Sequence, residues 1–95
     1  MPILIYITTS SETEANKIAE AVVGERLTAC ANIIPGMTSV YHWEGKLARE
    51  SEVVLILKTR AELFSAVEAR VKALHSYQNP CIVALPLSAG SAPLF

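Results

Sequence analysis

The chain has 95 residues, of which 52% are hydrophobic and 18% charged, and its formal net charge is −1. This length favours one domain over residues 1–95, and without a run of Lys or Arg the chain lacks the basic face that a sequence-independent hold on nucleic acid needs. No apolar run reaches the roughly 18 residues of a membrane span and the start lacks the features of a signal peptide, so we expect a cytoplasmic protein with Cys30 and Cys81 as free thiols.

The first third of the chain is typical of a strand, a helix and a second strand. Residues 3–9 are apolar and rich in β-branched side chains, as expected of a strand buried on both faces. Ser11 with Glu14 three residues later forms a capping box. Apolar residues then recur at spacings of three and four up to Gly24, which predicts a helix with one buried stripe. Residues 27–34 are strand-like again.

A long hairpin follows. Pro35-Gly36 predicts a break or a bulge in the second strand, which continues over residues 40–43. The segment 44–46 is a turn signal in which Gly45 is able to adopt a positive φ. Residues 52–58 form the returning arm of the hairpin.

The last third repeats the strand-to-helix order of the first. Thr59 with Glu62 predicts a second capping box. The helix that follows directs one apolar stripe inward, made of Leu63, Val67, Val71 and Leu74. Residues 81–85 then form a buried strand that Pro86 ends or places at a sheet edge, and residues 87–93 are loop-like.

The order strand, helix, strand, strand, helix, strand predicts an α+β fold. It is the ferredoxin-like split βαβ arrangement, an antiparallel sheet with both helices on one face. The strands are too apolar to leave the other face in water, and a domain of this size hides only about two-thirds of its unfolded surface. We therefore expect identical subunits to pack their sheets together and pair strands in a closed ring. A well-packed monomer with a few exposed aliphatic residues is the alternative.

Few residues are candidates for chemistry. Cys30, Cys81, His42 and His75 could form a soft site for copper or zinc, but their spacing contains no paired-ligand motif. Each also has a plain structural interpretation: a buried cysteine is usually a small hydrophobe, and His75 at a helix end suits the helix dipole. No catalytic triad, phosphate loop or carboxylate pair is evident, so we do not expect an enzyme.

Larger side chains indicate a possible pocket. Tyr41, Trp43 and Tyr77 are candidates for a shared pocket wall, and Trp43 near a hairpin tip is more typical of an interface than of a catalytic site. Lys58, at the end of the returning strand, could bind an anion together with a helix N-terminus and the nearby Arg26. Lys58 could equally be a plain surface residue.

Five ordered segments resemble the CutA family of divalent-cation tolerance proteins. They are ERLTACANIIPG at 25–36, TSVYHWEGK at 38–46, LKT at 57–59, HSY at 75–77 and ALPL at 84–87. The resemblance covers almost the whole chain. It implies the ferredoxin-like fold, a homotrimer related in architecture to the PII signalling proteins, and a role in the response to divalent metals, above all copper.

The resemblance also implies a cleft between subunits. Its lining would be Arg26, Cys30, Tyr41, Trp43, Lys58, His75 and Tyr77, with Cys30 and His75 as the copper contacts. The leading hypothesis is a cytoplasmic homotrimer that binds copper or another divalent cation weakly in this cleft. Two alternatives remain open: a PII-like sensor that takes a small anion at the cleft, and a non-catalytic trimeric scaffold.

Overall fold

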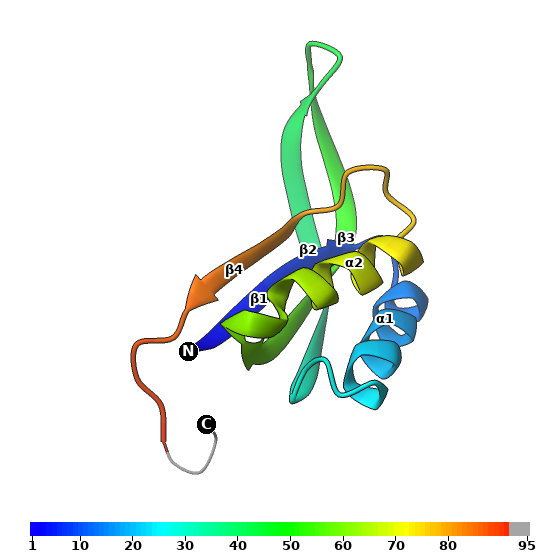
Figure 1. Cartoon of the computed structure of the whole chain (residues 1–95). Helices are drawn as coiled ribbons and strands as arrows, with labels where there is room; N and C mark the ends of the chain where they lie inside the picture. Colours follow the sequence, from blue (N-terminus) through cyan, green and yellow to red (C-terminus); the bar gives the residue numbers. More distant parts are fainter. Residues whose placement is uncertain (92–95) are drawn as a thin grey trace.

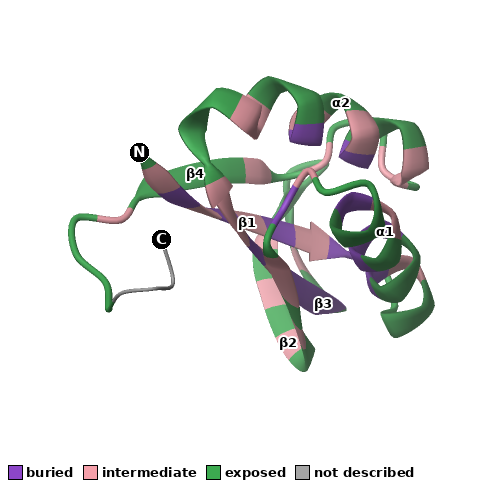
Figure 2. Ribbon diagram, turned by 60° about the horizontal axis from the view of Figure 1, so that its bottom comes forward, coloured by how far each residue is buried: buried purple, intermediate pink, exposed green. Residues whose placement is uncertain are grey.

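The computed structural model describes residues 1–91 and has the predicted order of elements (Figure 1). The elements are β1 (Pro2–Thr9), α1 (Glu12–Gly24), β2 (Cys30–Trp43), β3 (Lys46–Arg60), the 3-10 helix η1 (Ala61–Leu63), α2 (Phe64–Leu74) and β4 (Ile82–Pro86). The four strands form one sheet in the order β2-β3-β1-β4, and every neighbouring pair is antiparallel. This arrangement confirms the α+β split βαβ fold, with both helices on the same side of the sheet (Figure 2). The loop expected over 87–93 ends outside the described residues.

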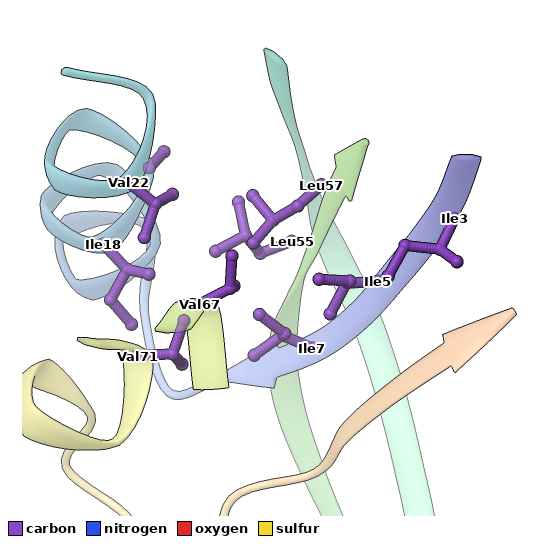
Figure 3. Close-up of a cluster of buried hydrophobic side chains, with 10 residues drawn as sticks. Ile3, Ile5, Ile7, Ile18, Val22, Leu55, Leu57, Val67 and Val71 are labelled. Carbon is purple, nitrogen blue, oxygen red and sulfur yellow. The ribbon is translucent and has the colours of Figure 1, made fainter. Parts of the chain in front are cut away.

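One face of the sheet and the two helices enclose the core (Figure 3). In β1 the odd-numbered residues are buried and the even-numbered ones are half-buried, because successive side chains point to opposite faces. The expectation that this strand is buried on both faces is therefore wrong for the subunit. The largest fully buried apolar side chains are Ile5, Ile7, Ile18, Val22, Leu55, Leu57, Val67 and Val71.

The two helices begin differently. At α1 the Ser11 hydroxyl accepts a hydrogen bond from the Glu14 N–H at 3.1 Å, as predicted, while the Glu14 carboxylate accepts the N–H of Ser10 at 2.9 Å. The second capping box is wrong. Thr59 instead donates its hydroxyl to the Leu27 carbonyl at 2.7 Å, and α2 begins only after η1, with no side-chain cap.

The β2–β3 hairpin is longer than predicted and projects beyond the helices, so that the molecule is 45 Å long (Figure 1). The predicted bulge is present as a shift of register between Ile34 and Met37, with Gly36 at φ 81°. A two-residue turn closes the hairpin with positive φ at both Glu44 and Gly45, the geometry that matches the twist of the strands. β2 begins at Cys30 instead of residue 27, and β3 begins at Lys46 instead of residue 52.

The sheet face turned away from the helices, here called the distal face, carries apolar side chains without cover. Register places Leu85 beside Leu4, and Val83 beside Tyr6. Leu85 and Ile34, in the edge strands β4 and β2, are each 49% exposed. The apolar members of the distal face are Leu4, Tyr6, Ile34, Val54, Ile56, Val83 and Leu85. Among residues 1–91, no helix is long and apolar enough to cross a membrane.

Candidate functional site

A cavity of about 730 Å³ lies at the end of the sheet where β1 and β2 begin and β3 ends. The last turn of α1 and the 3-10 helix η1 complete its wall. Three of the residues expected in a cleft, Arg26, Cys30 and Lys58, are together in it. The other lining residues are Met1, Pro2, Val23, Gly24, Thr28, Ala29, Thr59, Arg60 and Leu63.

The turn after α1 places Arg26 at this cavity. The N–H groups of Glu25 and Arg26 donate to the carbonyls of Ala21 and Val23, and those of Leu27 and Thr28 both donate to Val22. Arg26 adopts φ 61°, a left-handed conformation that residues other than glycine rarely use. The corner is held to α2 because the Glu25 carboxylate pairs with the Arg70 guanidinium at 2.9 Å.

Cys30 and Lys58 are direct partners in the β2–β3 ladder. The Lys58 ammonium lies 3.9 Å from the Cys30 sulfur and 3.3 Å from the side-chain oxygen of Asn32. Because α2 starts after η1, Lys58 does not lie directly at the α2 N-terminus. The anion site expected from Lys58 with a helix N-terminus and Arg26 stays a prediction, and Lys58 and Arg26 do line the same cavity.

His75 and Tyr77 lie at the other end of the sheet. The His75 ring is fully buried, and its Nδ1 accepts the Tyr77 N–H at 3.0 Å while its Nε2 lies 2.7 Å from the Thr8 carbonyl oxygen. An acceptor at Nδ1 requires the proton on Nε2, which then donates to Thr8. Nε2 thus joins the end of α2 to the end of β1 and Nδ1 holds the loop after α2, so neither nitrogen has a lone pair left for a metal.

A carboxylate that the sequence analysis missed organises this end. Glu52 is buried and accepts hydrogen bonds from the Tyr77 hydroxyl, at 2.7 Å, and from the Ser39 hydroxyl. Burial, reinforced by the Glu52 carboxylate, raises the pKa of Tyr77 above its usual range, so Tyr77 remains a donor. A glutamate at one end of an apolar strand carries no sequence signal of such a role; the register pairs it with Met37, and Ser39, two residues further along β2, reaches it diagonally.

Tyr41 and Trp43 form a third, separate group on the hairpin. The Tyr41 hydroxyl donates to Glu50 at 2.7 Å, and this bond raises the pKa of Tyr41. Trp43 is 64% exposed at the hairpin tip, opposite Lys46. Glu52, which binds Tyr77, lies six residues along β3 from Lys46, the partner of Trp43, and this is a separation of about 20 Å. Trp43 is therefore too far from Tyr77 to share a pocket wall with it within one subunit, whereas Tyr41 binds Glu50, two residues from the Glu52 that binds Tyr77.

The expected copper contacts are also apart. Lys58 is the ladder partner of both Cys30 in β2 and Leu4 in β1, so Cys30 lies level with Leu4. The His75 ring instead binds the carbonyl of Thr8, further along β1. These positions are four residue steps apart along the strand, about 13 Å. Within residues 1–91, no group of three or more His, Cys, Asp or Glu side chains could hold a metal ion. One subunit therefore does not hold copper between Cys30 and His75.

Comparison with known proteins identifies the family. The CutA1 divalent ion tolerance protein family matches residues 3–95. The divalent-cation tolerance protein CutA of Thermus thermophilus is 48% identical over 88 residues, which are 93% of this chain and 85% of that protein. The chloroplastic CutA protein of Arabidopsis thaliana is 44% identical over 94% of this chain, which spans only about half, 49%, of that relative.

Solved structures agree with this assignment. The T. thermophilus protein superposes with a TM-score of 0.92 at 47% identity, covering 96% of this chain and 88% of that one. A protein described as the periplasmic CutA of Archaeoglobus fulgidus superposes with a TM-score of 0.95 at 44% identity, covering 99% and 91%. The chain therefore belongs to the CutA1 divalent ion tolerance family.

Proposed function

We propose that this protein acts in divalent-cation tolerance as a cytoplasmic homotrimer in which the distal faces of three subunits pack together. The bare distal face carries the proposal. Burying an aliphatic side chain stabilises by about 1.5–3 kcal/mol, and Ile34, Val83 and Leu85 are each about half exposed in the single subunit. Several such residues on one face exceed what a monomer normally leaves in water.

The projecting hairpin supports the same assembly. Its tip carries two large exposed apolar side chains, Trp43 and Leu47, each 64% exposed. A tryptophan at such a position is typical of an interface anchor. A ring of three copies would bring each hairpin against a neighbouring subunit, and Trp43, which is far from Tyr77 within one subunit, would then pack on a neighbouring chain.

The metal part of the proposal rests on Cys30. We propose that copper binds there as copper(I), for which thiolate is the preferred class of ligand, with its remaining ligands supplied by a neighbouring copy. Copper(I) also meets less repulsion than a divalent ion from the Arg26 and Lys58 charges that line the same cavity. His75 is left out of the metal site because both of its ring nitrogens are engaged. The free thiols of Cys30 and Cys81 support a reducing, cytoplasmic setting.

The test is an anaerobic copper(I) titration of the assembled protein against a competing chelator. The wild-type protein should take up copper with at least tenfold higher affinity than the Cys30→Ser variant. Cys81→Ser is the matched control, since Cys81 is the other thiol and lies outside the cavity. Equal affinities of wild type and Cys30→Ser would contradict direct copper binding at this thiol.

A further inference from the structure

We propose that the cavity at the beginning of β2 binds a small organic anion with an apolar body, such as a carboxylate or a phosphate monoester. The cavity is lined by Arg26, Lys58 and Arg60 on one hand and by apolar side chains on the other. This inference does not rest on copper binding at Cys30, and its test measures a different ligand.

Charge is the first observation. The whole chain has nine acidic and eight basic residues, yet the cavity lining contains three basic residues and no acidic one. None of Arg26, Lys58 and Arg60 has a carboxylate within 4 Å among residues 1–91. Cations gathered in one cavity repel one another, although the Glu62 carboxylate partly offsets the Arg60 charge, and a bound anion would reduce that repulsion and gain charge-assisted hydrogen bonds.

An unsatisfied hydroxyl is the second observation. Thr28 lines the cavity and is only 5% exposed, and its side-chain oxygen has no hydrogen-bond partner. A buried polar group without a partner costs roughly 1–3 kcal/mol. Because the Thr28 Oγ1 itself is buried in the cavity wall, an anion oxygen would reach it and accept the missing hydrogen bond only after a small side-chain rotation.

The backbone of Arg26 is the third observation. Its left-handed φ of 61° is costly for a side chain with a Cβ atom, by about 1–2 kcal/mol. Glycine would relieve this cost. An arginine at this turn therefore indicates that the guanidinium is useful where it lies, at the mouth of a cavity that already contains Lys58 and Arg60.

The apolar part of the wall indicates that the ligand has an apolar body. Val23, Leu63, Pro2 and Ala29 line the cavity together with the cations. Its volume of about 730 Å³ is within the range of roughly 300–1,000 Å³ that small-molecule sites have. An inorganic ion would leave most of this space empty, whereas an aromatic or aliphatic body would fill it.

The test uses phenyl phosphate as the probe on the native, assembled protein. Binding is followed through the backbone amide signals in two-dimensional NMR spectra, with inorganic phosphate and phenol as comparison ligands. Phenyl phosphate should bind at least tenfold more tightly than either of them, and the shifted signals should cluster around Thr28, Ala29 and Lys58. Equal binding of phenol would overturn the role of charge, and equal binding of inorganic phosphate would overturn the role of the apolar wall.

Variants then assign the binding to these residues. Lys58→Met and Arg60→Gln should each weaken phenyl phosphate binding about tenfold, which corresponds to about 1.4 kcal/mol. Lys17→Met, at an exposed lysine of α1 outside the cavity, is the control and should change nothing. Arg26→Gly should weaken binding by a similar factor while keeping or raising the melting temperature, because it relieves the backbone. Unchanged binding in all three cavity variants would overturn the proposal.

Discussion

The two faces of the sheet are built from the same kinds of residue but end in opposite states. On the helix side, Ile5, Ile7, Leu55 and Leu57 have no exposed surface (Figure 3). On the distal side, aliphatic residues of neighbouring strands line up in register and remain partly or half exposed. Adjacent residues of one strand, such as Leu55 and Ile56, thus point to two faces, of which only one is covered by helices.

A single chain covers only the helix-side face of its sheet. Two helices are enough to cover one face of a four-stranded sheet, and the chain has no third layer for the other face within residues 1–91. We propose that further copies of the chain close the distal face. Experiments that perturb one face at a time separate the stability of the subunit from that of the assembly.

The largest effect is expected from Leu85→Lys on the distal face. A charge placed in an interface between subunits would be buried without a partner, and the trimer should dissociate. Sedimentation velocity should show the loss of the assembly, while circular dichroism retains the helical signal. Thr13→Lys, at an exposed position of α1, adds the same charge away from the sheet and should leave the mass unchanged.

On the helix-covered face, Leu55→Ala should lower the free energy of unfolding by about 2–5 kcal/mol. The substitution removes a fully buried side chain and leaves a cavity among β1, α1 and α2. Urea unfolding at several protein concentrations measures the change. A loss below 1 kcal/mol would show that this face is less tightly packed than described.

A smaller loss of stability is expected at the end of the distal face where Tyr77 binds Glu52. Tyr77→Phe removes one of the two hydroxyl donors to the buried Glu52 carboxylate. We expect a loss of about 1–3 kcal/mol in unfolding free energy, because a buried carboxylate loses a hydrogen bond. Tyr6→Phe, on the same face but without a side-chain hydrogen bond among those of residues 1–91, is the comparison and should cost less.

The smallest effect concerns pH at the link between α1 and the loop after α2. Although partial burial acts to raise it, hydrogen bonds from Ser10 and Ser76 lower the pKa of Glu14 below its ordinary 4.5. The ionised form thus stabilises the fold above about pH 4.5, and this contribution is lost as the pH falls through the lowered pKa.

Urea unfolding at pH 7 and pH 3 checks this sign. The wild type should be more stable than Glu14→Gln at pH 7, and the difference should shrink at pH 3. Glu20→Gln, on the exposed side of the same helix, serves as the control. If the difference in unfolding free energy between wild type and Glu14→Gln were larger at pH 3 than at pH 7, the stabilising role of the ionised Glu14 would be contradicted.

The elements were largely predictable from the sequence because local signals agreed with the fold. The cap at Ser11, the bulge at Gly36 and the turn at Gly45 each lie where local chemistry requires them. The capping box at Thr59 failed because tertiary structure used the same hydroxyl for a bond to Leu27. The extension of β3 back to Lys46 was missed because ladder pairing sustains a strand whose polar residues give no strand signal.

The candidate site was predictable only in part. Lys58 and Cys30 come together because they are ladder partners, and the resemblance to known relatives had already grouped them with Arg26. Nothing in the spacing of residues showed that His75 would spend both ring nitrogens on backbone groups, or that Arg60 would join the cavity. Such roles depend on distances across the sheet, which single-sequence patterns do not contain.

The central claim, that the distal face is closed by copies of the same chain, is tested most directly by the mass of the purified protein in solution. Sedimentation equilibrium at micromolar concentration should give three times the 10.3 kDa of the chain. A single species of 10.3 kDa at the same concentration would contradict the account, because the apolar distal face would then be stable in water.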